Sequence, residues 1–191
     1  TDGVRYYGNY GGFEIIFRPT GDDVISQLEV ENTTFSHRNG FEIFAYQDGK
    51  FTPLQELYAR GLLAESDLIV LAGGHVPTQN AFFHRIHLPE LLGNYDGVVL
   101  GISAGSMNCA DVVYSQPEEP GESAPEFRRF FPGLGLTTVQ ILPHYQKTRT
   151  MELDGLRLFE DITYADSMGH SFLVLPDGSY VLGENGHETL F

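Results

Sequence analysis

The predicted fold is organised around the sequence YDGVVLGISAGSMN, residues 95–108. This stretch predicts a short apolar strand over residues 98–102, a turn centred on Ser103, and the start of a helix rich in small residues. Gly101 and Gly105 flank the serine in a G-x-S-x-G pattern. In such a pattern the glycines let a strand and the following helix pack closely, and the serine is held exposed at the end of the sheet. An ordinary strand-to-helix turn capped by a serine fits the same residues, so the motif alone leaves both interpretations open.

Strands alternate with helices around this stretch, which predicts an α/β domain with a mostly parallel sheet. Residues 68–71, Leu-Ile-Val-Leu, are an unbroken apolar run, typical of a strand that is covered on both faces. We expect further strands at residues 13–17, 41–46, 98–102 and 138–142, and a hairpin of residues 172–175 and 180–182 around Pro176-Asp177-Gly178-Ser179. We expect helices at residues 22–31, 52–63, 77–86, 104–114 and 151–159, and irregular chain at residues 1–12 and 115–125.

The composition favours one folded domain over residues 1–191, of which roughly the first 50 residues are atypical. The apolar fraction of 41% allows a buried core. The 11 Lys and Arg against 26 Asp and Glu give a formal net charge of −15, which disfavours binding to nucleic acid or to anionic membrane surfaces. The chain has a single cysteine, Cys109, and neither a leader of the basic-then-apolar type nor an apolar run of membrane length. We therefore expect a cytoplasmic protein.

Three of the predicted strands end in residues that suit catalysis: Gly73-Gly74, Ser103 and His144. The carboxyl ends of parallel strands meet at one edge of a sheet, and reactive groups gather there. A serine nucleophile needs a base within hydrogen-bond reach, and of the seven histidines only His144 is placed by its strand to face Ser103. The amides of Gly74 and Ala104 would then be donors to an oxyanion. A polar strand end at His144 and a tight turn at the glycine pair are the structural alternatives.

The spacing of these residues argues against the α/β-hydrolase fold. That fold places its acid and then its histidine on later strands, generally far beyond the serine. Between Ser103 and His144 there is room for one crossover helix and one strand, and the chain after Ser103 is short for that fold.

Three motifs in this order resemble peptidase family S51, the serine peptidases that include aspartyl dipeptidase (dipeptidase E) and cyanophycinase. The motifs are Leu71-Ala72-Gly73-Gly74, Gly101-Ile102-Ser103-Ala104-Gly105-Ser106 and Leu142-Pro143-His144-Tyr145, and the resemblance covers residues 67–182. It implies a three-layer α/β sandwich with a mostly parallel central sheet, like that of the class I glutamine amidotransferases (flavodoxin-like), with a serine in place of their cysteine. The family's first strand and the loop after it are not recognisable in residues 1–50.

The resemblance also implies roles for individual residues. Ser103 is then the nucleophile, His144 its general base, and the amides of Gly74 and Ala104 the oxyanion hole, while Gly73 and His75 line the substrate site. In the dipeptidase branch the triad acid falls in the loop after the nucleophile helix, where Glu118 fits best. The carboxylates left open besides it are Glu119, Asp111, Asp166 and Glu184. The cation that would bind an N-terminal aspartate is left open among Arg85, Arg128, Arg129 and Arg149.

Together these features predict a serine peptidase that hydrolyses small peptides through an acyl-enzyme. Two other classes stay open: a catalytically inactive member of the amidotransferase-like superfamily that binds a small molecule, and another acyl hydrolase, an esterase or amidase. We expect no cofactor and no metal, because His84 and His87 lack a neighbouring acidic or cysteine ligand that completes a recognisable site. The expected partner is a small peptide substrate, with no nucleic acid and no membrane, and a homodimer is left open.

Overall fold

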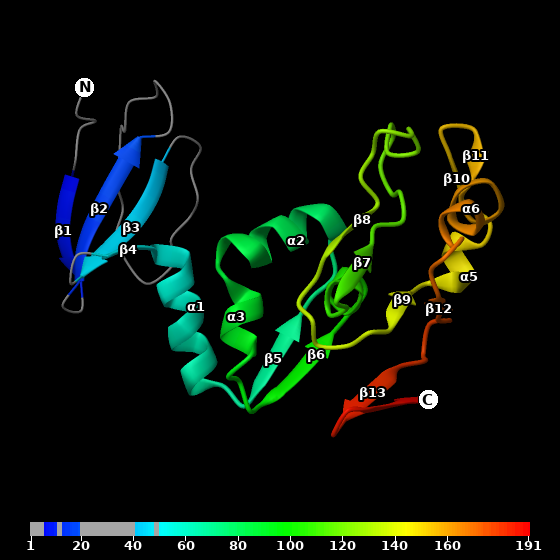
Figure 1. Ribbon diagram of the computed structural model, residues 1–191. Helices are drawn as coiled ribbons and strands as arrows, with labels where there is room; N and C mark the ends of the chain where they lie inside the picture. The colour runs from blue at the N-terminus through cyan, green and yellow to red at the C-terminus, as the bar shows by residue number, and fades with distance from the viewer. Residues whose placement is uncertain (1–5, 11–12, 20–40, 48–49) are drawn as a thin grey trace. The chain divides into compact units, whose positions relative to one another are not determined.

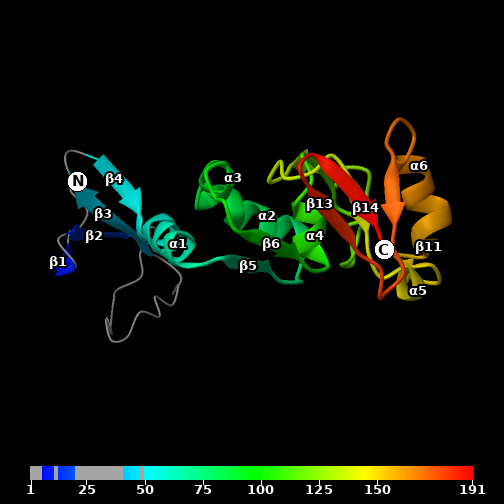
Figure 2. The ribbon, with the colours of Figure 1, turned by 90° about the horizontal axis from the view of Figure 1, so that it is seen from below.

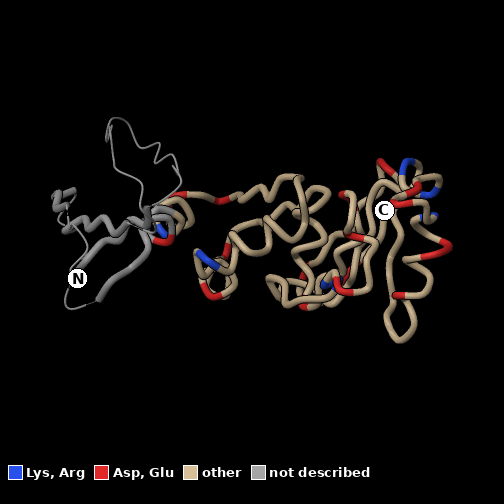
Figure 3. Tube along the Cα trace, turned by 90° about the horizontal axis from the view of Figure 1, so that it is seen from above, with Lys and Arg blue, Asp and Glu red and all other residues tan. Residues whose placement is uncertain are grey.

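The computed structural model describes residues 6–10, 13–19, 41–47 and 50–191 (Figure 1). The chain forms two compact units, residues 1–64 and 65–191. The single domain over residues 1–191 stays a prediction. Acidic side chains outnumber basic ones along the second unit, in keeping with the net charge of −15 (Figure 3). In the described part of the chain, no helix combines the length and the apolar character that a membrane span requires.

The first unit contains a four-stranded antiparallel sheet in the order β1-β2-β3-β4, and a helix follows it. The elements are β1 (Tyr6–Tyr10), β2 (Phe13–Pro19), β3 (Phe41–Gln47), β4 (Lys50–Pro53) and α1 (Leu54–Glu65). The strands expected at residues 13–17 and 41–46 are confirmed. Residues 6–10 were expected to be irregular, but they pair with β2 from Tyr6↔Phe17 to Tyr10↔Phe13. The helix begins at Leu54, later than expected, because Pro53 still pairs with Phe44. The helix expected at residues 22–31 lies outside the described residues.

The second unit begins with a parallel strand pair joined by two helices. The elements are β5 (Leu68–Leu71), α2 (Val76–Arg85), α3 (Leu88–Leu92), β6 (Val98–Gly101) and α4 (Ala104–Asn108). The pairing runs from Leu68↔Val98 to Leu71↔Gly101, so both strands end at the same edge. Helix α4 packs against both strands and against α2 (Figure 2). Helix α4 contributes Ala104 and Met107 to the core of this unit. The full set of core residues is Val76, Ala104, Met107, Val113, Tyr114 and Leu142.

Four further strand pairs continue this unit. The elements are β7 (Val112–Tyr114), β8 (Phe130–Pro132), β9 (Gln140–Leu142), α5 (Tyr145–Thr148), β10 (Glu152–Leu153), β11 (Leu156–Arg157), a π-helix (Leu158–Thr163), α6 (Tyr164–Asp166), β12 (Phe172–Val174), β13 (Val181–Glu184) and β14 (His187–Leu190). Strands β7 and β8 are antiparallel, whereas β9 and β12 are parallel. The rings of Tyr114 and Phe172 stack with centroids 4.4 Å apart, which joins the first of these pairs to the second.

Two helices expected from the sequence are wrong. Helix α4 ends at Asn108 instead of continuing to residue 114, because residues 112–114 form β7 and pair with β8. The helix expected over residues 151–159 is a short β10–β11 hairpin that leads into a π-helix. Asp154 and Gly155 form its turn, and both have the positive φ that a helix excludes, 53° and 82°.

The hairpin expected around residues 176–179 is also wrong. Strand β12 pairs in parallel with β9, and β13 pairs with β14 instead of with β12. The loop 115–125 is not fully exposed either, since Ser115 and Glu122 are buried.

The mixed α/β fold with parallel strands is confirmed, but the parallel strands lie in two separate two-stranded sheets, β5-β6 and β12-β9. The expectation that β5 is covered on both faces is wrong. One face of the β5-β6 pair is exposed, and its side chains are Leu68, Val70, Val98 and Leu100. The three-layer arrangement stays a prediction.

We predict that Gly105→Ala strongly destabilises the second unit. A Cβ at this position would lie 1.9 Å from the carbonyl oxygen of Leu71, so α4 would have to move away from β5. Overpacking of this kind costs about 1–3 kcal/mol or more of unfolding free energy. Urea unfolding followed by circular dichroism measures the change. Gly183→Ala is the matched control, because no heavy atom lies within 4 Å of the added Cβ. Equal stability of the two variants would contradict the close contact between α4 and β5.

Candidate active site

Ser103 stands between β6 and α4 with φ 53° and ψ −118°, a backbone conformation that non-glycine residues rarely adopt. The packing around it holds this conformation. A Cβ on Gly101 would lie 2.7 Å from Cα of Ser106, so the glycine is needed for the close turn. The carbonyl oxygen of Ser103 accepts bonds from the amide and the hydroxyl of Ser106 at 2.9 and 2.6 Å. The turn therefore has the strained geometry expected of the elbow, with its serine partly accessible.

His144 follows β9 and precedes α5, again with a positive φ, 60°. Its Nε2 lies 3.0 Å from Oγ of Ser103, which is hydrogen-bond distance. The two side chains expected to meet are therefore brought together. The imidazole is 44% exposed, so a substrate can reach it from solvent.

The carboxylate behind this imidazole belongs to Asp177, in the turn after β12. Its Oδ1 lies 2.7 Å from Nδ1 of His144. Because an ionised carboxylate only accepts hydrogen bonds, Nδ1 carries the hydrogen. In the neutral imidazole this leaves the lone pair of Nε2 facing the hydroxyl of Ser103. The three side chains form a continuous series from hydroxyl to imidazole to carboxylate.

The expectation that Glu118 occupies this position is not met. Among the described residues no hydrogen bond joins Glu118 to His144, and the amide of Glu118 donates instead to Oε2 of Glu122 at 2.8 Å. The alternative Asp166 accepts bonds from Tyr114 and Arg129. Neither residue therefore backs the imidazole.

The sequence did contain a signal for Asp177. It follows a short apolar strand and one proline, as His144 follows Leu142 and Pro143. The expected hairpin paired residues 172–175 with residues 180–182, so it did not place Asp177 at the edge where the parallel strands end. Because β12 instead runs parallel to β9, with Val174 opposite Leu142, the turns after both strands lie at one edge.

Two main-chain amides, those of Gly74 and Ala104, are the expected donors to an oxyanion at Ser103. Gly73 packs so closely on Ser103 that an added Cβ would lie 3.3 Å from the serine Cβ. Gly74 follows with φ 154°, and Ala104 begins the helix after the serine. Within the described part of the chain, neither the amide of Gly74 nor that of Ala104 donates to a protein acceptor. Both amides therefore keep an unused hydrogen-bond donor among the described contacts.

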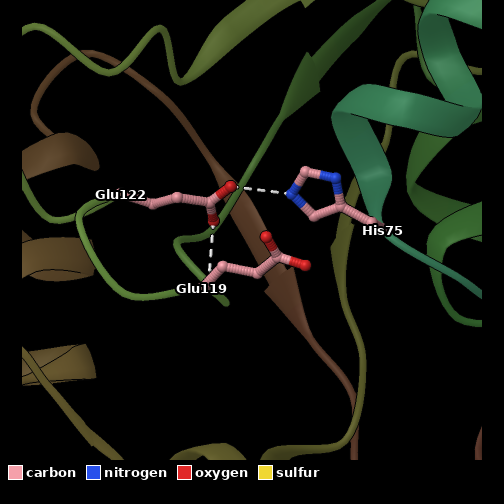
Figure 4. Close-up of side chains that lie close together, drawn as sticks. All are labelled: His75, Glu119 and Glu122. Atoms are coloured by element: carbon pink, nitrogen blue, oxygen red, sulfur yellow. Dashed lines mark hydrogen bonds and ion pairs between the residues drawn. The ribbon is translucent and has the colours of Figure 1, made fainter.

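His75, expected to line the substrate site, is already bonded at both ring nitrogens. Nδ1 lies 2.8 Å from Oγ1 of Thr78, and Nε2 lies 2.7 Å from Oε1 of Glu122 (Figure 4). The other carboxylate oxygen of Glu122 accepts from the amides of Glu118 and Glu119 at 2.8 and 3.1 Å. The contact ties the loop 118–122 to the chain beside Gly74.

These bonds favour the ionised form of the Glu122 carboxyl. Burial alone would raise the pKa of its carboxyl, but the bonds from the two amides and from His75 outweigh burial and hold the pKa below its usual value. His75, Glu119 and Glu122 also bring possible metal-ligand atoms within 4.8 Å of one another. Both oxygens of Glu122 accept from protein donors, and these bonds link the loop 118–122 to the chain at His75.

Arg129, one of the cations considered for substrate binding, is engaged elsewhere. Its Nη1 lies 2.7 Å from Oδ2 of Asp166, and its Nη2 donates to the carbonyl of Ser123 at 2.8 Å. Arg85, Arg128 and Arg149 are exposed. The charge of Arg129 is therefore compensated by Asp166, and its role in the described structure is to hold β8 to the segment after the π-helix.

No protein-family model matches the chain, and no curated protein matches it in sequence. Among solved structures it is similar to a protein of Listeria monocytogenes EGD-e that is provisionally assigned as a peptidase E. The identity is 17% and the TM-score 0.53, over 70% of this chain and 63% of that protein. The likeness shows a shared α/β fold, and this chain spans less than two thirds of the other protein's length.

We predict that Glu122→Gln lowers the melting temperature more at pH 7 than at pH 3.5. A carboxyl whose pKa is depressed in the folded state adds stability above its unfolded pKa of about 4.3, and this stability is lost as the pH falls through the folded value. At pH 7 the loss should be about 1 kcal/mol, because bonds to a charged acceptor are replaced by bonds to a neutral one. Calorimetry at both pH values measures the difference. Glu119→Gln is the control, and a deficit for Glu122→Gln that is equal at both pH values would contradict the charged tie.

Proposed function

We propose that this chain is a serine-type hydrolase that cleaves small peptides, in the manner of a dipeptidase E. The single observation that carries the proposal is the hydrogen-bonded series of Ser103, His144 and Asp177, with contacts of 3.0 and 2.7 Å. The arrangement matches the geometry by which serine triads are recognised on unrelated folds. The fold likeness to the Listeria protein supports a peptidase over other hydrolases.

The proposed reaction follows from the proton positions. Oγ of Ser103 attacks the substrate carbonyl carbon while Nε2 of His144 takes its proton. Asp177 accepts the Nδ1 hydrogen bond, which keeps the imidazole in the required tautomer and stabilises the imidazolium. The amides of Gly74 and Ala104 bind the oxyanion. His144 then gives the proton to the leaving amine, and a water molecule activated by the same imidazole hydrolyses the acyl-enzyme.

Cys109, the only cysteine of the chain, is not a competing nucleophile. Burial raises the pKa of its thiol to about 11, so the thiol stays protonated near neutral pH. Its Sγ also donates to the carbonyl of Gly105 at 3.2 Å. A covalent adduct formed at pH 7 by a serine-directed reagent can therefore be assigned to Ser103 by peptide mapping.

We predict a fluorophosphonate adduct on Ser103 that Ser103→Ala abolishes and His144→Ala strongly reduces. For peptide hydrolysis, Ser103→Ala should lower kcat by about 10⁴-fold or more, and Asp177→Asn by about 10² to 10⁴-fold. Intact-mass spectrometry and turnover of a dipeptide library measure the two effects. Glu118→Gln is the matched carboxylate control and should keep kcat within about threefold, since only a triad acid contributes through the imidazole.

The same experiment separates the competing functions. Turnover of short acyl esters far above that of every dipeptide would replace the peptidase by an esterase. Absence of both the adduct and turnover on correctly folded protein would contradict a hydrolase. Ligand-induced thermal stabilisation that persists in Ser103→Ala would then favour a binding protein.

A further inference from the structure

The contact between Asp177 and His144 needs support from elsewhere in the structure. The Asp177 side chain is 59% exposed and the His144 side chain 44%. An exposed hydrogen bond between an imidazole and a carboxylate competes with water, and it contributes little by itself to holding the two groups in one geometry. If Asp177 backs the imidazole during a reaction, its main chain must be fixed by other contacts.

The sheet fixes the chain only as far as Leu175. The β9–β12 ladder ends at Val174↔Leu142, and one further bond runs from the amide of Leu175 to the carbonyl of Leu142 at 2.8 Å. The amide of Tyr145 then donates to the carbonyl of Leu175 at 3.1 Å. Asp177 lies two residues beyond this last main-chain contact with the sheet, in a turn closed by the bond from the amide of Ser179 to the carbonyl of Pro176 at 3.2 Å.

The next contact comes from a side chain. The amide of Asp177 donates to Oε1 of Gln146 at 2.7 Å, and Nε2 of Gln146 lies 3.5 Å from the carbonyl oxygen of Asp177. The shorter bond is the stronger of the two, and the longer one orients the side-chain amide of Gln146. Gln146 is in α5, whose first turn begins at His144.

We propose that Gln146 is the positioning residue of the triad acid. Its side-chain amide holds the main chain of Asp177, so one short helix sets the positions of both the imidazole and the carboxylate. This inference rests on the proposed serine hydrolase. Gln146 acts on the reaction only through Asp177 and touches neither the hydroxyl of Ser103 nor the imidazole of His144 among the described contacts.

The test begins with Gln146→Met, which keeps the length of the side chain but removes both polar atoms. Asp177 then loses its fixed position, and kcat should fall by about 5- to 50-fold, because a small misplacement of a catalytic group is costly. KM should stay within about twofold, because Gln146 does not bind substrate. Gln146→Glu keeps an acceptor for the amide of Asp177 and should keep kcat within about threefold. Ser179→Ala, in the same turn, is the control and should leave both constants unchanged.

A double-mutant cycle with Asp177→Asn decides whether the effect passes through the acid. In the Asp177→Asn background, Gln146→Met should change kcat by less than about twofold. Full multiplication of the two losses would overturn the proposal, as would an unchanged kcat in Gln146→Met alone. If Ser103→Ala and Asp177→Asn were themselves without effect, the hydrolase would fail and not the positioning role alone. Melting curves of all variants show that each is folded.

Discussion

The site depends on the close approach of α4 to β5. Gly105 lies against the carbonyl of Leu71 so tightly that no side chain fits between them. This contact starts the helix directly after Ser103 and leaves the serine with a positive φ. Among the described residues, the same short connection leaves the amide of Ala104 without a protein acceptor. Steric exclusion at one glycine therefore accounts for both the partly exposed serine, which we propose as the nucleophile, and the unbonded amide, which we propose as an oxyanion donor.

A second constraint, parallel strand pairing, brings together the other two residues of the proposed triad. Because β9 and β12 run in the same direction, the residues that follow them come to one edge, and His144 and Asp177 meet there. The loop 118–122 has a different role. It is tied through Glu122 to His75, and the hydroxyl of Ser123 and the amide of Gly121 bind Asp154 at 2.6 and 2.8 Å. Hydrogen bonds on two sides thus hold this acidic loop beside the chain that carries Gly74.

Features set by residues close in sequence could be predicted from the sequence, whereas features set by pairing between distant segments could not. The G-x-S-x-G turn and the strand before His144 are local patterns, and they identified the Ser103–His144 contact. Asp177 was missed because the partner of β12 is set by pairing between segments more than 30 residues apart, which local turn residues do not determine. The resemblance to a family placed the acid at Glu118, where the described structure has a loop contact instead.

The most direct test is a crystal structure of the chain after reaction with a fluorophosphonate. The proposed serine mechanism predicts phosphorus bonded to Oγ of Ser103 and a phosphoryl oxygen within about 3 Å of the amides of Gly74 and Ala104. It also predicts that Nδ1 of His144 stays bonded to Asp177. An unmodified Ser103, or an imidazole that turns away from Asp177 toward another carboxylate, would contradict it.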